Sequence, residues 1–145
     1  MKILSCLIML FLAGTAVAGE WETDFKKAQE KAEKEGKALL VNFTGSDWCG
    51  WCIKLDGEVF SKKEFQTWAK DNVVLVTLDF PRRKKQSNDI KKQNSELMKK
   101  YGVRGFPTIL FLDAKGNVIG KSGYMKGGPT AWTKNADSIL KKGAS

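Results

Sequence analysis

The residues best suited to chemistry in this 145-residue chain are two cysteines, Cys49 and Cys52, separated by Gly50 and Trp51. The chain contains no histidine, which excludes Ser-His-Asp triads, Cys-His pairs and histidine-ligated zinc. Two thiolates are too few for a structural zinc site, and a disulfide that closes so short a loop stabilises a fold only weakly. The chemistry left for the pair is thiol-disulfide exchange, in which a thiolate attacks a disulfide.

The third cysteine, Cys6, lies in an N-terminal segment with the features of an export signal. A lysine provides the positive start, an apolar stretch follows over residues 3–13, and Ala16-Val17-Ala18 is a typical cleavage site. We therefore predict a signal peptide over residues 1–18 and one domain over residues 19–145. The alternative is an uncleaved anchor helix, although the apolar stretch is shorter than the roughly 20 residues that span a bilayer.

Export would place the cysteine pair in an oxidising compartment. The pair would then either act as an oxidant or be kept reduced by a dedicated electron donor. Hydrophobic residues make up 42% of the chain and charged residues 28%, which is the ordinary globular mix. This composition disfavours a disordered chain, a collagen and a polytopic membrane protein.

Apolar periodicity and turn-forming residues predict alternating helices and strands around the pair. The predicted helices cover residues 23–35, 49–59, a segment opened by a capping box at residues 61–64, 95–101 and 129–142. The predicted strands cover residues 38–43, 73–80, 108–112 and 117–120. The last two strands form a hairpin across a turn that contains Gly116.

This order predicts an α/β fold with a central mixed β-sheet flanked by helices, its first two strands parallel through a right-handed crossover. In such sheets, reactive groups gather beyond the carboxyl ends of the strands. Cys49 follows the first strand after a short turn and begins a helix. Because a helix N-terminus offers free N–H groups and a partial positive charge, we expect Cys49 to be the attacking thiolate.

The cysteine motif and a second segment together resemble the thioredoxin superfamily. The second segment is Lys100-Tyr101-Gly102-Val103-Arg104-Gly105-Phe106-Pro107-Thr108, about fifty residues after the cysteines. The resemblance extends from residue 38 to the C-terminus, with the N-terminal helix as a usual extension. Within the superfamily, the chain is similar to exported bacterial thioredoxin-like proteins, including small periplasmic disulfide reductases and the C-terminal domain of the periplasmic electron-transfer reductase.

The resemblance implies a substrate-binding surface around the cysteines. It implies a cis peptide bond between Phe106 and Pro107, which would lie against the cysteine pair and expose backbone to a substrate strand. Trp48, Gly50 and Trp51 flank the two sulfurs. The tryptophans would add apolar area for docking an extended substrate, or they would be partly buried packing residues.

The resemblance also assigns a resolving role to Cys52, which would attack the mixed disulfide formed by the first cysteine. Thioredoxins use a buried acid at the end of the first strand to deprotonate this thiol, and the matching residue here is Asn42, which cannot accept a proton. Asp56 lies four residues after Cys52 on the same helix face and is our candidate base. Alternatively, Asp56 is a solvated charge beside Lys54 or Lys63.

Two charged features remain outside this predicted chemistry. Asp47, beside the pair, is expected to point to solvent. The run Arg82-Arg83-Lys84-Lys85 contributes to a net charge of +9 and resembles a nucleic-acid patch only by composition. We interpret it as a solvated loop, with attraction to acidic partners or a membrane surface as the alternative.

These observations predict a periplasmic thiol-disulfide oxidoreductase that acts as a reductase or isomerase on protein disulfides. The expected partners are disulfide-containing protein substrates and a membrane or periplasmic electron donor, with no nucleic acid, and the protein is expected to be a monomer. No metal or organic cofactor is expected. Two alternatives stay open: a module that binds Cu(I) through the thiolates for delivery, and a substrate-holding chaperone whose redox activity is incidental.

Overall fold

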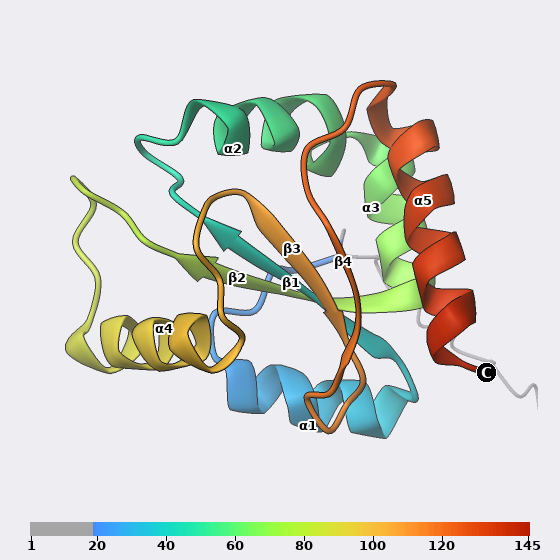
Figure 1. Cartoon of the computed structure of the whole chain (residues 1–145), viewed down its shortest axis with the longest axis horizontal. Coiled ribbons are helices and arrows are strands. Elements are labelled where there is room, and N and C mark those ends of the chain that lie inside the picture. The colour runs from blue at the N-terminus through green and yellow to red at the C-terminus, as the bar shows by residue number, and fades with distance from the viewer. Residues whose placement is uncertain (1–18) are drawn as a thin grey trace, which may run out of the picture.

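The computed structural model describes residues 19–145, which fold around a four-stranded sheet in the order β2-β1-β3-β4 (Figure 1). β1 (Ala38–Thr44) pairs in parallel with β2 (Val73–Asp79) and antiparallel with β3 (Thr108–Leu112). β3 forms an antiparallel hairpin with β4 (Val118–Ser122). The predicted mixed sheet and the parallel first pair are therefore confirmed.

Helices cover both faces of the sheet (Figure 1). α1 (Phe25–Glu35) and α4 (Asn88–Lys100) pack on one face, together with alternate apolar residues of β1, β2 and β3. The other face carries α2 (Gly50–Leu55), the π-helical segment η1 (Asp56–Phe60), α3 (Lys63–Asn72) and α5 (Gly128–Gly143). Since the central strands contact apolar residues on both faces, their sequences are nearly continuous apolar runs.

The ends of several elements follow from local capping. The side chain of Asp24 accepts the Lys27 N–H at 3.0 Å and begins α1, and Gly36 ends that helix with a left-handed φ of 64°. The hairpin turn has Gly116 at a φ of 90°, a conformation that favours glycine. Pro129 lies in the first turn of α5, where its missing N–H is tolerated.

Two predicted helix boundaries are wrong. The segment 61–64 is not a capping box, because Ser61 closes the preceding helix by donating from Oγ to the Gly57 carbonyl at 3.2 Å, and α3 begins without a side-chain cap. α4 begins at Asn88 rather than near residue 95. Its first turns are held by polar contacts, including the bond from buried Asn94 Nδ2 to the Asp79 carbonyl at 2.9 Å, so apolar periodicity does not reveal them.

The predicted signal peptide, residues 1–18, lies outside the described residues. Within residues 19–145, none of the helices combines the length and apolar character needed to cross a membrane. The described chain therefore consists of one sheet and the helices that cover it.

Candidate functional site

The cysteine pair lies directly after the carboxyl end of β1, as predicted, where a turn leads into α2. Cys49 is the N-cap residue of α2 and forms a disulfide with Cys52, with 5.2 Å between the two Cα atoms. The Cys52 N–H donates to the Cys49 sulfur at 3.3 Å. Both side chains are buried, so the neighbouring residues control which molecules can reach the sulfur atoms.

Trp48 ties the cysteine segment to two other loops. Its indole Nε1–H donates to the Phe80 carbonyl at 2.7 Å, and its ring meets the Phe106 ring edge-on at 5.9 Å between centroids. A methyl group at Gly45 would lie 2.5 Å from the Trp48 ring, so the turn after β1 requires glycine there. These contacts and its partial burial favour packing as the main role of Trp48.

Trp51 is the exposed tryptophan of the pair, with 57% of its surface accessible. Its ring lies 5.0 Å from that of Tyr124, and the ammonium of Lys54 lies 5.2 Å from its centroid. Gly50 beside it is also exposed, and Ile53 one residue beyond the motif is 53% exposed. The motif therefore presents an apolar surface to solvent next to the disulfide.

The predicted cis bond is present between Phe106 and Pro107. Both residues are partly exposed. The Phe106 ring packs against Phe80 at 5.0 Å between centroids, and Thr108 Oγ1 donates to the Gly105 carbonyl at 2.7 Å. Through Trp48, this segment is joined to the loop that carries the cysteines.

A cavity of about 380 Å³ is lined in part by Cys52. Asn42 contributes to its wall, and the Oδ1 atom of this residue is buried without a hydrogen-bond partner among the described residues. Asp56 is exposed and lines the same cavity as Cys52. The complete lining is Trp21, Asn42, Thr44, Ser46, Cys52, Ile53, Asp56, Thr77 and Lys84.

The sequence also allowed Asp56 to be a solvated surface charge beside Lys54 or Lys63. In the part of the chain that the structure describes, Lys54 pairs with Glu58 at 3.8 Å, and Asp56 takes part in no ion pair. Glu58 also accepts a hydrogen bond from the Tyr124 hydroxyl at 2.8 Å. The carboxylate of Asp56 therefore lies at the cavity wall with no cation of residues 19–145 within 4 Å.

The sequence led us to expect that Asp47 points to solvent, but its side chain instead binds another loop. Its carboxylate accepts the backbone N–H groups of Arg82, Arg83 and Lys84 at 2.9, 2.8 and 2.8 Å. These hydrogen bonds, led by those from Arg82 and Lys84, lower the pKa of Asp47 from its ordinary value of 3.8 to about 2. Asp47 therefore anchors the segment after β2 beside the cysteines.

This anchoring should depend on acid pH. Because the pKa of Asp47 is lower in the folded protein, its contribution to loop order is present above about pH 4 and is lost as pH falls through about 2. The amide proton shifts of residues 82–84, followed by NMR, should titrate with a midpoint near the low pKa. Asp47→Asn should abolish the titration, whereas a midpoint near 3.8 would contradict the anchoring role.

Several residues that shape the site carry no sequence signal of their own. Asp79 accepts from both the backbone N–H and the hydroxyl of Ser46, at 2.9 and 2.6 Å, and so fixes the turn before the cysteines. Tyr124 packs against Trp51 although the two lie far apart in the chain. Arg82 covers the Trp48 ring, with 3.7 Å between its guanidinium carbon and the ring centroid. Only the folded chain brings these pairs together.

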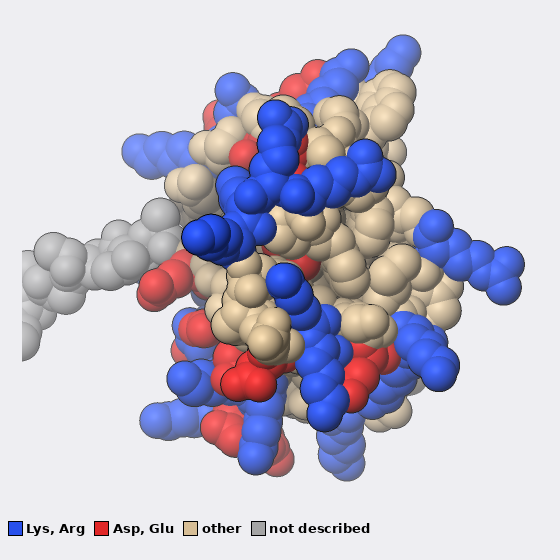
Figure 2. Space-filling model, turned by 90° about the vertical axis from the view of Figure 1, so that its left-hand side faces the viewer, with Lys and Arg blue, Asp and Glu red and all other residues tan. Residues whose placement is uncertain are grey.

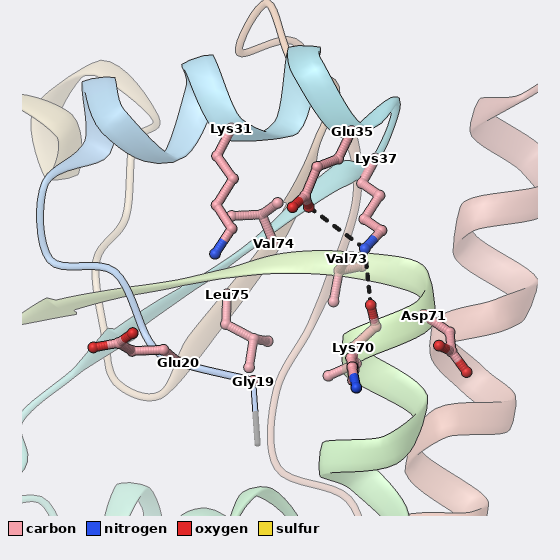
Figure 3. A pocket seen from close by; sticks show the side chains of 11 residues that line it. Gly19, Glu20, Lys31, Glu35, Lys37, Lys70, Asp71, Val73, Val74 and Leu75 are labelled. Carbon is pink, nitrogen blue, oxygen red and sulfur yellow. Dashed lines mark hydrogen bonds and ion pairs between the residues drawn. The ribbon is translucent and has the colours of Figure 1, made fainter. Parts of the chain in front are cut away.

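A larger cavity of about 450 Å³ lies along the outer edge of β2, apart from the cysteines (Figure 3). Its wall holds charges of both signs, and the ammonium of Lys37 lies 3.4 Å from the Glu35 carboxylate and donates to the Lys70 carbonyl at 2.8 Å. No residue of the predicted site lines it. The lining residues are Gly19, Glu20, Lys31, Glu35, Lys37, Ala69, Lys70, Asp71, Val73, Val74 and Leu75.

Comparison with known families decides the assignment, because a family described as "Thioredoxin-like domain" matches residues 25–134. The chain belongs to the thioredoxin-like family. This thioredoxin-like chain is 35% identical over 122 residues to a Chlamydia pneumoniae protein named "Disulfide bond reductase DsbH", covering 84% of this chain and 73% of the relative. The family resemblance and the fold predicted from sequence are both confirmed.

Two further comparisons extend this result. A solved structure titled "DsbH Oxidoreductase" superposes with a TM-score of 0.82 at 32% identity, covering 97% of this chain and 94% of that one. "Thiol:disulfide interchange protein DsbD" of Colwellia psychrerythraea is 33% identical over 100 residues, which are 67% of this chain and 15% of the relative. The thioredoxin-like chain is therefore a thiol-disulfide oxidoreductase.

Proposed function

We propose that this protein is an exported reductase of protein disulfides, with Cys49 as the attacking thiolate and Cys52 as the resolving thiol. The observation that carries the proposal is the disulfide at the start of α2, beside the exposed ring of Trp51. The similarity to a protein named as a disulfide bond reductase supports the direction of electron flow. The export-signal features of residues 1–18 support a periplasmic location.

The reaction begins from the reduced protein. The Cys49 thiolate attacks one sulfur of the substrate disulfide, and the other substrate sulfur leaves as a thiolate that takes up a proton. Cys52 then loses its proton and attacks the Cys49 sulfur, which releases the second substrate thiolate. Two electrons pass to the substrate, and the protein ends in the disulfide form seen here. A dithiol donor then reduces this disulfide again. We propose a protein related to the DsbD interchange proteins as this donor.

Substrate binding is assigned to the surface around the pair. The exposed ring of Trp51 and the neighbouring Gly50 give an extended chain apolar contact and close access to the sulfurs. Phe106 and Pro107 present the backbone of the opposite loop, and Trp48 holds this loop against the cysteine segment. A bound strand would lie between these two surfaces.

Proton removal from Cys52 is assigned to Asp56. Asn42 stands at the end of β1 where a buried acid would serve, and its amide cannot accept a proton. Asp56 lines the same cavity as Cys52 and is open to solvent, so a water molecule entering that cavity would connect the thiol with the carboxylate. The proton can then pass from Asp56 to bulk water.

Replacement of Asp56 by Asn should slow resolution of the mixed disulfide and leave the first attack nearly unchanged. General-base assistance is worth about 10²–10⁴-fold, and a thiol near its own pKa needs less, so we expect a slowing of about tenfold. Stopped-flow measurement of the two phases tests this. Glu64→Gln, which removes an exposed carboxylate from α3, is the charge-matched control. Equal resolution rates in the Asp56 variant and the wild type would return Asp56 to a surface charge.

The proposed direction of electron flow is tested with two substrates. Catalytic amounts of the protein should accelerate the reduction of insulin disulfides by dithiothreitol. They should not accelerate the recovery of scrambled ribonuclease, which requires an isomerase. Faster ribonuclease recovery without faster insulin reduction would replace the reductase assignment with an isomerase.

A further inference from the structure

We infer that residues 82–85, here called the basic loop, select polypeptide partners that carry Asp or Glu residues next to the disulfide or dithiol undergoing exchange. The inference rests on the proposed function and names the substrate class of the same site. The loop has the sequence Arg82-Arg83-Lys84-Lys85, and all four side chains are exposed. It connects β2 to α4 at one side of the molecule (Figure 1).

The basic loop has a defined position relative to the cysteines. Three consecutive backbone N–H groups of the loop donate to the carboxylate of Asp47, two residues before Cys49. Arg83 Nη2 also donates to the Asp47 carbonyl at 2.6 Å, and Lys84 Nζ donates to Ser46 Oγ at 3.3 Å. These five hydrogen bonds hold the basic loop against the turn that precedes the cysteines. Because the loop backbone is already ordered, binding a partner costs less conformational entropy than it would for a free loop.

Two side chains of the basic loop lie close to the cysteine motif. The guanidinium of Arg82 lies over the ring of Trp48, whose edge contacts Phe106 in the loop that ends at Pro107. Lys84 lines the cavity that holds Cys52. A chain bound at the cysteines and extending toward Trp48 or toward this cavity would therefore pass close to these cations.

Among the described residues, no cation of the basic loop forms an ion pair within 4 Å, although Arg83 is close enough to Asp47 to help lower its pKa. Across residues 19–145 the ion pairs within 4 Å are Lys31–Glu22, Lys37–Glu35 and Lys54–Glu58, and none includes a loop residue. The nearby carboxylates of Asp47 and Asp79 accept hydrogen bonds from the protein itself. Figure 2 views the side of the molecule where the loop lies and shows Lys and Arg side chains bordering an uncharged area. A positively charged surface of this kind attracts acidic segments and raises their association rate.

A polypeptide is favoured over the other polyanions because the cations border a reactive disulfide and exposed apolar side chains. Trp51 and Ile53 offer contacts that suit a peptide, and the cysteine pair reacts only with sulfur. A membrane surface or a nucleic acid would use the cations but would leave the disulfide without a role. These ligands serve as alternatives in the experiment.

The test uses three peptides that each contain one internal disulfide and differ only in flanking residues, which are Asp, Ser or Lys. The reduced wild-type protein should reduce the Asp peptide about tenfold faster than the Lys peptide at low ionic strength, and about 0.5 M NaCl should shrink this ratio to below about twofold. Replacing all four loop cations by Gln should reduce the ratio at least about fivefold at low salt. The matched control removes four exposed lysines remote from the loop in sequence, by the changes Lys34→Gln, Lys134→Gln, Lys141→Gln and Lys142→Gln.

The control variant should keep the wild-type ratio, because it has the same net charge as the loop variant but an intact loop. Circular dichroism spectra of both variants should match that of the wild type, which checks that both variants fold. A wild-type ratio near one, or equal losses in both variants, would overturn the inference. Loop-dependent binding to phosphatidylglycerol vesicles with a peptide ratio near one would assign the loop to membranes instead. If the wild type reduced none of the three peptides, the proposed function itself would be wrong, and the inference with it.

Discussion

Replacing Cys52 by Ser should convert the protein into a trap that stays covalently joined to its substrate. The Cys49 thiolate can still attack a disulfide, but the second thiol of the pair, which would break the mixed disulfide, is gone. Incubation of this variant with a peptide disulfide should therefore give an adduct of one protein and one peptide strand in intact-mass spectra. Dithiothreitol should release the strand, and catalytic turnover should fall to the uncatalysed rate.

The reciprocal change, Cys49→Ser, should trap almost no peptide. The remaining thiol lies within the first turn of α2 and not at its N-cap, so it lacks the N–H donation and the positive helix end that stabilise a thiolate at Cys49. The two variants control for each other, because each keeps one thiol of the pair and the two differ only in the place of that thiol on the helix. Trapping by Cys49→Ser and not by Cys52→Ser would reverse the assigned roles. If neither variant formed an adduct, a thiolate-based Cu(I) module or a chaperone would be the better description.

Replacing Trp132 by Ala should destabilise the fold by about 3–5 kcal/mol, the usual cost of removing a fully buried large aromatic side chain. Trp132 is completely buried on α5 and contacts the rings of Phe60, Phe65, Trp68 and Phe111. Its indole N–H also donates to the Gly123 carbonyl at 3.0 Å. The substitution leaves a cavity and removes the hydrogen bond to the Gly123 carbonyl. Urea unfolding followed by circular dichroism measures the resulting change in the free energy of unfolding.

Trp51→Ala is the matched control for this stability experiment. It removes the same side chain from a position where 57% of the surface is accessible, so the expected loss is below about 1 kcal/mol. Similar losses in the two variants would mean that the second helical layer, α3 and α5, does not form the core described here.

The parts that could be predicted from the sequence have local signals. The apolar run of β1 and the turn after it place Cys49 at a helix start, because strand, turn and cap each depend on a few neighbouring residues. Asp24 and Gly36 mark the ends of α1 in the same way. The cis bond before Pro107 came from the family resemblance, since composition alone favours the trans form.

The parts that could not be predicted depend on contacts between distant segments. Asp47 looks like a solvated charge in the sequence, and only the fold brings the backbone N–H groups of residues 82–84 to its carboxylate. Tyr124 reaches Trp51 only because the chain after β4 returns over α2. The early start of α4 depends on a polar contact from Asn94, which apolar periodicity does not register.

The redox potential of the Cys49–Cys52 couple tests the central claim most directly. Equilibration with glutathione buffers of known ratio, followed by acid quenching and mass analysis of the two forms, gives the value. A reductase of protein disulfides must hold its electrons at a low potential, so we predict a value near or below about −220 mV. A value near about −120 mV, typical of a strong disulfide oxidant, would contradict the assignment.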